Sequence, residues 1–218
     1  MPKKAVIFDL DGVIVDTAKY HYLAWKKLAN QLGFDFTPDQ NERLKGVSRV
    51  KSLEILLEIG GVSLSESEKE RYMIEKNENY LSYITKMDEN DILPNIKSLI
   101  QHLKKQGVLI ALGSASKNAK QILDTLKITF YFDAVVDGNE VSAAKPDPEV
   151  FLLAAKLLKR NPDECIVVED AAAGIEAANT AKMLSIGIGK KEILNEAAFV
   201  LESTSLLTNE FMDKLIGN

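Results

Sequence analysis

Two acidic residues, Asp9 and Asp11, follow a short apolar run and stand directly before Gly12. Residues two apart on a strand point to the same side of it, so both carboxylates can face one site. Ionised carboxylates this close repel each other unless a cation or a shared proton intervenes. The pair therefore predicts a metal site; the competing interpretation is a simple turn ahead of Gly12, which Asp-rich strings often form.

Polar residues also follow other apolar runs of the chain. Ser114 comes just after one such run, Lys145 precedes a proline, and Glu169 and Asp170 directly follow another run. Ligands bind outside the carboxyl ends of the strands in a parallel sheet. These side chains supply a hydroxyl and an ammonium for a phosphate group, and acids for a hard cation such as Mg²⁺.

The elements that would carry these residues alternate between strand and helix. Short apolar runs predict buried parallel strands, at 5–8, 108–112, 134–136, 166–168 and 184–188. Between them, apolar residues recur with helical spacing, for example over 96–103 and 119–126. The pattern predicts an α/β fold with a Rossmann-like, doubly wound parallel sheet.

The stretch 16–87 differs, because it has helical periodicity and charged faces but no convincing buried strand. Its first helix carries Trp25 on an apolar stripe and stops at Gly33, and we interpret the charge-rich stretch 66–78 as a solvated helix face. We therefore predict a helical cap domain over 16–87, inserted after the first strand into a core domain formed by 1–15 and 88–218.

Composition excludes several functional classes. The 218 residues include 27 Lys plus Arg and 32 Asp plus Glu, giving a net charge of −5, which provides no basic surface for sequence-independent nucleic-acid binding. No stretch approaches the roughly 20 apolar residues that span a bilayer, so we expect no membrane insertion. The one cysteine, Cys165, excludes an intrachain disulfide and fits a cytoplasmic protein.

The ordered set Asp9-Leu10-Asp11-Gly12, Ser114, Lys145-Pro146 and Glu169-Asp170 resembles the four motifs of the haloacid dehalogenase superfamily of phosphotransferases. The resemblance covers the whole predicted core. It implies that Asp9 is the nucleophile that forms an aspartyl phosphate and that Asp11 is the general acid and base.

The same resemblance implies how the metal and the phosphoryl group are held. Mg²⁺ would be bound by the carboxylates of Asp9 and Asp170 and by the main-chain carbonyl of Asp11, with help from Glu169. The transferring phosphoryl group would be bound by Ser114, Ala115 and Lys145. Ala171 follows Asp170 where many members of the superfamily have serine, so any supporting role of that hydroxyl is in doubt.

Residues of the predicted cap resemble, stretch by stretch, the sugar-phosphate mutases of this superfamily. The matching stretches are Asp16-Thr17, His21, Trp25, 44–49, Lys76-Asn77 and 116–118. The likeness implies that substrate is bound by His21, Trp25, Lys45, Gly46, Val47, Arg49, Lys76, Ser116, Lys117 and Asn118. It implies a hinge at Asp16 and Thr17, close to where the cap begins.

Within that set, Arg49 with Ser116, Lys117 and Asn118 would hold the non-reacting phosphate of the sugar, because a guanidinium with such donors suits a phosphate dianion. His21 and Lys76 would position Asp11 or the sugar ring when the cap closes. Simpler roles compete with these: His21 as a structural helix residue, Trp25 as cap packing, and Lys45 with Arg49 as a solvated face.

The expected activity is therefore an isomerase that interconverts β-D-glucose 1-phosphate and glucose 6-phosphate through phosphorylated Asp9 and a glucose 1,6-bisphosphate intermediate. The alternative is a magnesium-dependent sugar-phosphate phosphatase, which differs only in transferring the group to water. A non-catalytic sensor would be expected to lack Asp9 or Asp11, and both are present. We expect a monomer whose partner is a small sugar phosphate.

Overall fold

The computed structural model of the chain describes residues 4–217 and has at its centre a six-stranded, wholly parallel sheet. The strands lie in the order β3-β2-β1-β4-β5-β6, the doubly wound order in which the winding reverses between β1 and β4. The predicted fold class is confirmed. The strands are β1 Ala5–Phe8, β2 Leu109–Gly113, β3 Ala134–Val136, β4 Cys165–Glu169, β5 Leu184–Ile188 and β6 Phe199–Leu201.

The central strand β1 is buried along its whole length. Val6 and Phe8 pack into the hydrophobic cluster on one face of the sheet, and Ala5 and Ile7 pack into the cluster on the other face. A strand covered on both faces needs an apolar residue at every position. That requirement is why an uninterrupted apolar run predicted this strand with its bounds.

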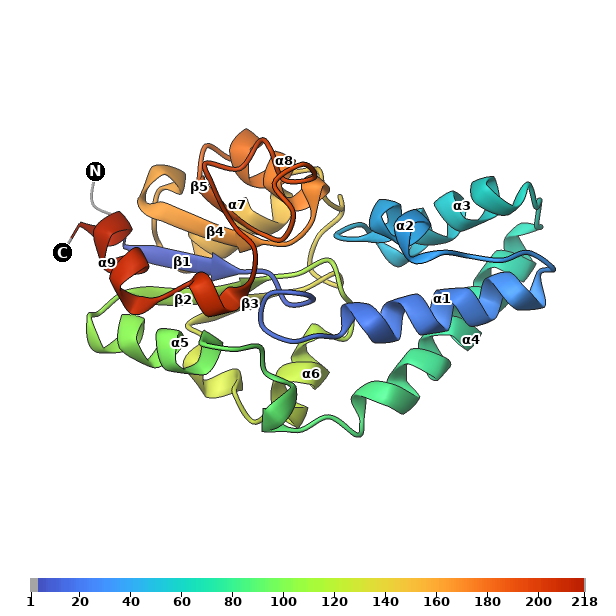
Figure 1. Cartoon of the computed structure of the whole chain (residues 1–218), viewed down its shortest axis with the longest axis horizontal. Helices are drawn as coiled ribbons and strands as arrows, with labels where there is room; N and C mark the ends of the chain where they lie inside the picture. The colour runs from blue at the N-terminus through green and yellow to red at the C-terminus, as the bar shows by residue number, and fades with distance from the viewer. Residues whose placement is uncertain (1–3, 218) are drawn as a thin grey trace.

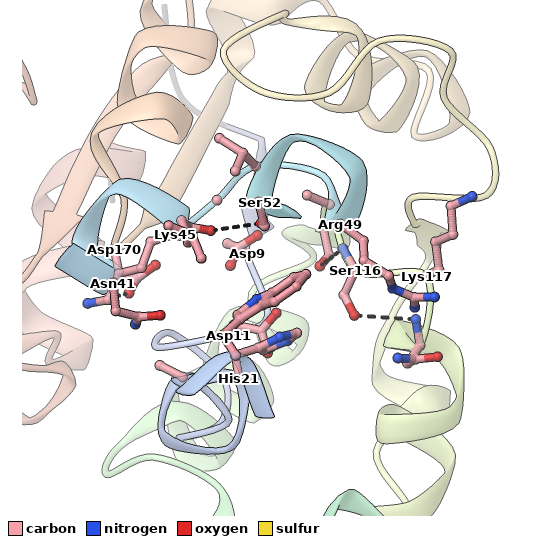
Figure 2. Close-up of a pocket in the computed structure, with 18 of the residues that line it drawn as sticks. Asp9, Asp11, His21, Asn41, Lys45, Arg49, Ser52, Ser116, Lys117 and Asp170 are labelled. Atoms are coloured by element: carbon pink, nitrogen blue, oxygen red, sulfur yellow. Dashed lines mark hydrogen bonds and ion pairs between the residues drawn. The ribbon is translucent and has the colours of Figure 1, made fainter. Parts of the chain in front are cut away.

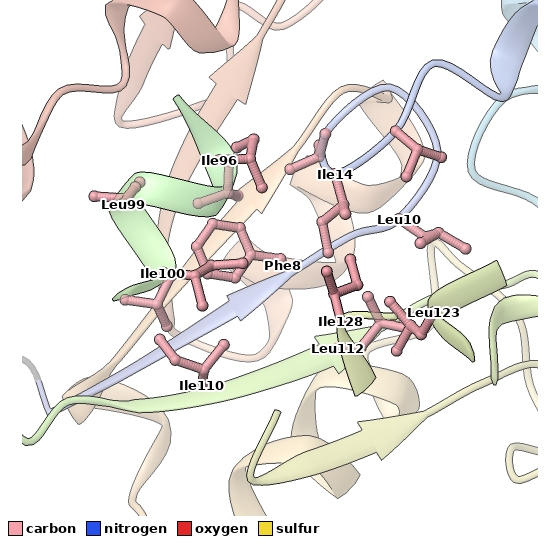
Figure 3. Packing of buried hydrophobic residues seen from close by; sticks show 14 of the residues in the cluster. Phe8, Leu10, Ile14, Ile96, Leu99, Ile100, Ile110, Leu112, Leu123 and Ile128 are labelled. Atoms are coloured by element: carbon pink, nitrogen blue, oxygen red, sulfur yellow. The ribbon is translucent and has the colours of Figure 1, made fainter. Parts of the chain in front are cut away.

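Helices cover both faces of the sheet (Figure 1). Apolar residues of α5, α6 and α9 belong to the cluster that contains Phe8, and those of α7 and α8 belong to the opposite cluster. Figure 3 shows Phe8 beside Ile96, Leu99 and Ile100 of α5; burying a side chain of this size contributes about 1.5–3 kcal/mol. These helices are α5 Ile96–Lys105, α6 Ala119–Thr125, α7 Glu149–Leu157, α8 Ala172–Thr180 and α9 Asn209–Ile216.

The first four helices after β1 extend away from the sheet (Figure 1). They are α1 Ala18–Gln31, α2 Pro38–Asn41, α3 Arg49–Gly60 and α4 Glu66–Ile84. Trp25, Leu28 and Ala29 of α1 pack with Leu53 and Leu56 of α3 in a hydrophobic cluster of their own. This separate core is what a cap domain requires, and 16–87 remains our proposal for its extent.

The two ends of the cap segment lie side by side. Val15 forms an antiparallel bridge with Ile92, and the main-chain N–H of Leu93 donates to the carbonyl of Ile14 at 2.9 Å. Short 3-10 turns complete the chain, at Glu42–Leu44, Glu89–Asp91, Thr129–Tyr131, Pro162–Glu164 and Thr204–Leu206. No helix within residues 4–217 is long and apolar enough to cross a membrane.

The sequence placed β2 and β4 within one residue of their observed bounds but missed β6. β6 has three residues, and none of them is fully buried. It lies at the edge of the sheet, where one side has no neighbouring strand. Its residues Phe199, Val200 and Leu201 are nevertheless apolar, so the signal that predicted the other strands was present here and was not interpreted as a strand.

Candidate active site

The predicted catalytic residues meet at the carboxyl edge of the sheet, around the point where the winding reverses. Asp9 follows β1 directly, and Glu169 ends the neighbouring strand β4 with Asp170 next to it. Gly12 has φ +80, and a Cβ there would lie 2.3 Å from Asp170 Oδ2. Glycine is therefore required for the turn after β1 to pass beside this carboxylate.

Three carboxylates at this edge form a candidate metal centre. One oxygen each of Asp9, Glu169 and Asp170 lie within 4.8 Å of one another. Burial, followed by the charge of Asp9, raises the pKa of Glu169 to about 7. Burial and the charge of Glu169 raise the pKa of Asp170 well above its ordinary value. Both pKa shifts arise because negative charges lie close together and away from water, an arrangement that a bound cation would stabilise.

Lys145 supplies one positive charge to this cluster. Its side chain is inaccessible to solvent, and its Nζ lies 2.6 Å from Asp9 Oδ1 and 2.8 Å from Glu169 Oε2. Burial alone would lower the pKa of Lys145, but the charges of Asp9 and Glu169 raise it above its ordinary value. Ser114, which is 1% exposed, follows β2 and lines the same site.

Asp11 occupies a different environment from Asp9. Thr17 Oγ1 donates a hydrogen bond to Asp11 Oδ1, and His21 Nε2 lies 3.7 Å from the same oxygen. Burial, then the charge of Asp9, raises the pKa of Asp11 to about 6, against the opposing effects of Thr17 and Lys76. A carboxyl with this pKa can both release and accept a proton near neutral pH.

The buried Lys76 pairs with the partly exposed His21 beside Asp11. Lys76 Nζ lies 2.8 Å from His21 Nδ1. Burial and the nearby Arg49 lower the pKa of Lys76 to about 7, and burial and Lys76 lower the pKa of His21 well below its ordinary value. With Nδ1 accepting from Lys76, the neutral imidazole carries its proton on Nε2. That N–H is the one nearest Asp11.

At another part of the site, cap and core residues share one amide oxygen. Arg49 donates to Asn77 Oδ1 at 2.7 Å, and Asn118 of the core donates to the same oxygen at 2.9 Å. Ser116 Oγ accepts from the main-chain N–H of Asn118 at 3.3 Å. The sequence comparison included Asn77 in a matching stretch but gave it no role, whereas here it joins the two groups expected to bind a phosphate.

The cap also approaches the core at Lys45 and Gly46. Lys45 Nζ lies 3.6 Å from Asp170 Oδ2 and 3.1 Å from Glu42 Oε1. Gly46 has φ +72, and a Cβ there would lie 2.8 Å from the Cβ of Ala171. The loop carrying Lys45 is thus close to the core rather than a solvated face, and Gly46 permits that approach.

One pocket brings most of the predicted site residues together (Figure 2). Lys145 lines an adjoining pocket, and Glu169 has no exposed surface. Asp16 and Thr17 directly precede α1, where Thr17 donates a hydrogen bond to Asp11. Trp25 both packs in the cap core and lines the pocket, with Lys76 Nζ 4.7 Å from its ring centroid. The predicted residues in the lining are Asp9, Asp11, His21, Trp25, Lys45, Gly46, Val47, Arg49, Lys76, Ser114, Ala115, Ser116, Lys117, Asn118 and Asp170.

Sequence reasoning missed several residues of this pocket. Ala18, Asn41, Leu44 and Ser52 also line it. Asn41 is 7% exposed and Ser52 is 3% exposed, so both are buried polar residues. A lone amide or hydroxyl in a helical pattern carries no signal that separates it from a surface residue, and only the fold reveals these positions.

The fold and the arrangement of acids, lysine and serine define a phosphotransferase site of the class expected from the motifs. Residues 3–182 match the family described as haloacid dehalogenase-like hydrolase, and the chain belongs to this family. The resemblance inferred from the four motifs is therefore confirmed.

Comparison with individual relatives is more specific than the match to the family. The chain is 46% identical over 211 residues to β-phosphoglucomutase of Bacillus subtilis, covering 96% of this chain and 93% of that protein. A crystal structure of β-phosphoglucomutase from Clostridium difficile matches with a TM-score of 0.93 and 48% identity, over 98% of this chain and 97% of that one. A phosphorylated carbohydrates phosphatase of Thermotoga maritima is 32% identical over 202 residues, covering 92% and 91% of the two chains.

Proposed function

We propose that this chain is an enzyme with β-phosphoglucomutase activity, which interconverts β-D-glucose 1-phosphate and glucose 6-phosphate. The observation that carries the proposal is one pocket lined both by Asp9 and Asp11 and by Arg49, Ser116 and Asn118. The first pair suits phosphoryl and proton transfer, and the second group suits the binding of a phosphate that does not react. The 46% identity to the Bacillus subtilis mutase supports the same activity.

We propose Mg²⁺ as the metal of this site. The donor set fits a hard cation, because Asp9, Glu169 and Asp170 offer carboxylate oxygens within 4.8 Å of one another. Asp9 and Asp170 would hold the ion, with the main-chain carbonyl of Asp11 and help from Glu169. When bound, the ion would offset the repulsion between the Asp9 carboxylate and the phosphoryl oxygens.

The chain's own residues account for two successive transfers. In the first, the sugar hydroxyl at C6 attacks the phosphorus on phosphorylated Asp9, the Asp9–phosphorus bond breaks, and Asp11 takes the hydroxyl proton. In the second, Asp9 attacks the C1 phosphate of the resulting bisphosphate, and Asp11 returns its proton to the departing C1 oxygen. The pKa of Asp11, raised to about 6 by burial and by Asp9, suits a group that plays both parts.

Lys145 and Ser114 would bind the oxygens of the phosphoryl group in transit. Lys145 already lies 2.6 Å from Asp9, so its charge acts where negative charge develops. Arg49 would bind the phosphate at the other end of the sugar. Because both ends of the bisphosphate must visit Asp9 in turn, the group around Arg49 must accept either phosphate.

A sugar-phosphate phosphatase is the second candidate, favoured by the likeness to the Thermotoga maritima enzyme. The two activities differ in whether a sugar hydroxyl or water receives the group from Asp9. The hydrogen bond from Asn118 to Asn77 and the close approach of Gly46 to Ala171 favour the mutase, since a cap held close to the core limits the access of water to phosphorylated Asp9.

Phosphorus NMR tests the choice. With Mg²⁺, β-D-glucose 1-phosphate and a catalytic amount of glucose 1,6-bisphosphate, we expect glucose 6-phosphate to accumulate while inorganic phosphate stays a minor product. His21→Ala should raise the hydrolysed fraction, because it weakens the cap side of the site. Free phosphate as the main product of the wild-type protein would establish the phosphatase instead.

We further propose that the enzyme works as a monomer in the cytoplasm. The lone cysteine, Cys165, is buried in the core and offers no disulfide between subunits. A single species near 24 kDa in analytical ultracentrifugation is the expected result, against a chain mass of 24.1 kDa.

A further inference from the structure

The phenolic hydroxyl of Tyr80 is a buried polar group that packing does not explain. Tyr80 lies on α4 with 0% of its surface exposed, and its hydroxyl makes no hydrogen bond within residues 4–217. A buried hydroxyl without a partner destabilises a fold relative to an apolar group of the same shape. Phenylalanine would fill the space without that cost, so the hydroxyl calls for another role.

The surroundings of Tyr80 connect it to the proton-transfer group. Its ring stacks on His21 with the ring centroids 4.1 Å apart, and Lys76 Nζ lies 4.9 Å from its centroid. His21 in turn lies 3.7 Å from Asp11 Oδ1. Thr17 donates to the same oxygen of Asp11, so Tyr80 packs directly against a residue that belongs to the surroundings of the reacting carboxyl.

The hydroxyl stays protonated in this position. A tyrosine hydroxyl ionises only at about pH 10 in its ordinary state. It is therefore a hydrogen-bond donor at any pH at which the enzyme works, and it does not act as a base. Thr17 already donates to one carboxylate oxygen of Asp11, and an ionised carboxylate can accept several more hydrogen bonds.

We propose that Tyr80 is a positioning residue for Asp11, donating a hydrogen bond that holds the Asp11 carboxylate toward the reacting sugar hydroxyl in the substrate-bound site. The inference rests on the proposed function, in which Asp11 moves the proton. Tyr80 comes from cap helix α4 and Asp11 from the core. The contact would thus link helix α4 of the cap to the group that transfers the proton.

Tyr80→Phe tests this proposal, with Tyr83→Phe as the matched control on the same helix. Removing one hydrogen bond should lower the mutase kcat about tenfold, with the KM for β-D-glucose 1-phosphate unchanged. The rate at which acetyl phosphate phosphorylates Asp9 should also be unchanged, because acetate leaves without needing a proton. Tyr83, whose ring stacks on Tyr20, should give wild-type rates, and neither variant should have a lower Tm.

The decisive comparison repeats Tyr80→Phe in an Asp11→Ala background. A residue that acts through Asp11 should cause no further loss there. The same tenfold loss in both backgrounds, an equal loss with acetyl phosphate, or no loss at all would overturn the role of Tyr80. Wild-type mutase activity in Asp11→Ala alone would instead overturn the proposed function, so the two failures are distinguishable.

Discussion

Asp9 and Asp11 are the same residue type two positions apart, yet their neighbours suit them to different tasks. Asp9 is 4% exposed, and Lys145 Nζ lies 2.6 Å from its carboxylate. Within residues 4–217 no lysine or arginine forms an ion pair with Asp11; Thr17 donates to it, and burial with the charge of Asp9 raises its pKa to about 6. The proposed nucleophile and the proposed proton carrier therefore have different surroundings although one short motif supplies both.

Asp9→Asn is the sharpest substitution at this scale. An amide cannot form the aspartyl phosphate, so we expect mutase turnover to fall by several orders of magnitude. The side chain is nearly isosteric, so far-ultraviolet circular dichroism should remain that of the wild type. Asp39→Asn, on the exposed face of α2, is the control and should retain full turnover. Near-native activity of Asp9→Asn would remove the nucleophile from the proposed mechanism.

From residue types alone, a site residue could be predicted only where a charged group follows a strand or where the residue belongs to a known motif. Asn77 accepts hydrogen bonds from Arg49 and Asn118, and Tyr80 lies against His21. Neither stands out in the sequence, because an amide or a phenol in a helix is compatible with many roles. Their importance comes from what the fold brings beside them.

At the scale of elements, α4 shows how one helix serves two environments. Its charged residues Glu66, Glu70, Arg71 and Glu78 are exposed, as the interpretation of 66–78 as a solvated face proposes, yet Lys76 is 3% exposed and Tyr80 is fully buried. Residues four apart lie on the same side of a helix. The side of α4 that carries Lys76 and Tyr80 therefore faces the site. The many charged residues around these two positions made the whole helix look solvent-exposed in the sequence.

Arg49 begins α3 and tests whether the cap grips a distant phosphate. Arg49→Ala should lower mutase kcat/KM strongly, by about a hundredfold or more if a charged hydrogen bond is lost. Phosphorylation of Asp9 by acetyl phosphate should change little, because that donor has no second phosphate for Arg49 to bind.

The control for this pair of measurements is Arg43→Ala. Arg43 lies in the same cap but pairs with the exposed Glu58 at 2.9 Å, and such surface pairs contribute little to stability. It should leave both rates unchanged. Parallel losses with both donors in Arg49→Ala would mean that the guanidinium stabilises the fold rather than binding the substrate.

At the scale of the whole molecule, the sheet with its helices and the cap have separate hydrophobic clusters. The sheet and its helices form one body, and α1 and α3 enclose another cluster. Apolar runs predicted five of the six strands, and helical periodicity predicted the helices within 16–87. They could not predict that Gly46 lies close to Ala171 or that Asn77 contacts Asn118. Contacts between the cap and the core do not require a regular spacing of residues in either segment of the sequence.

The metal centre also affects the stability of the whole molecule, in a way that depends on pH. In the metal-free protein, burial and Asp9 raise the pKa of Glu169 to about 7, and burial and Glu169 raise that of Asp170. Near pH 5.5 these carboxyls hold protons in the folded state that they lose on unfolding. They therefore stabilise the metal-free fold there relative to higher pH, and the contribution of Glu169 is lost as the pH rises through about 7.

Mg²⁺ needs the ionised carboxylates, so protons compete with it at low pH. We expect a Mg²⁺ concentration a hundredfold above Kd at pH 7.5 to stabilise the protein by about 2.7 kcal/mol, a rise in Tm of roughly 5–10 °C for a chain of this size. The same concentration at pH 5.5 should give a much smaller rise. Asp170→Asn should abolish the rise at pH 7.5 while remaining folded. Differential scanning calorimetry with and without chelator measures the rise in Tm in each of these three cases. An equal rise in Tm at both pH values would mean that Mg²⁺ binds elsewhere than at Glu169 and Asp170.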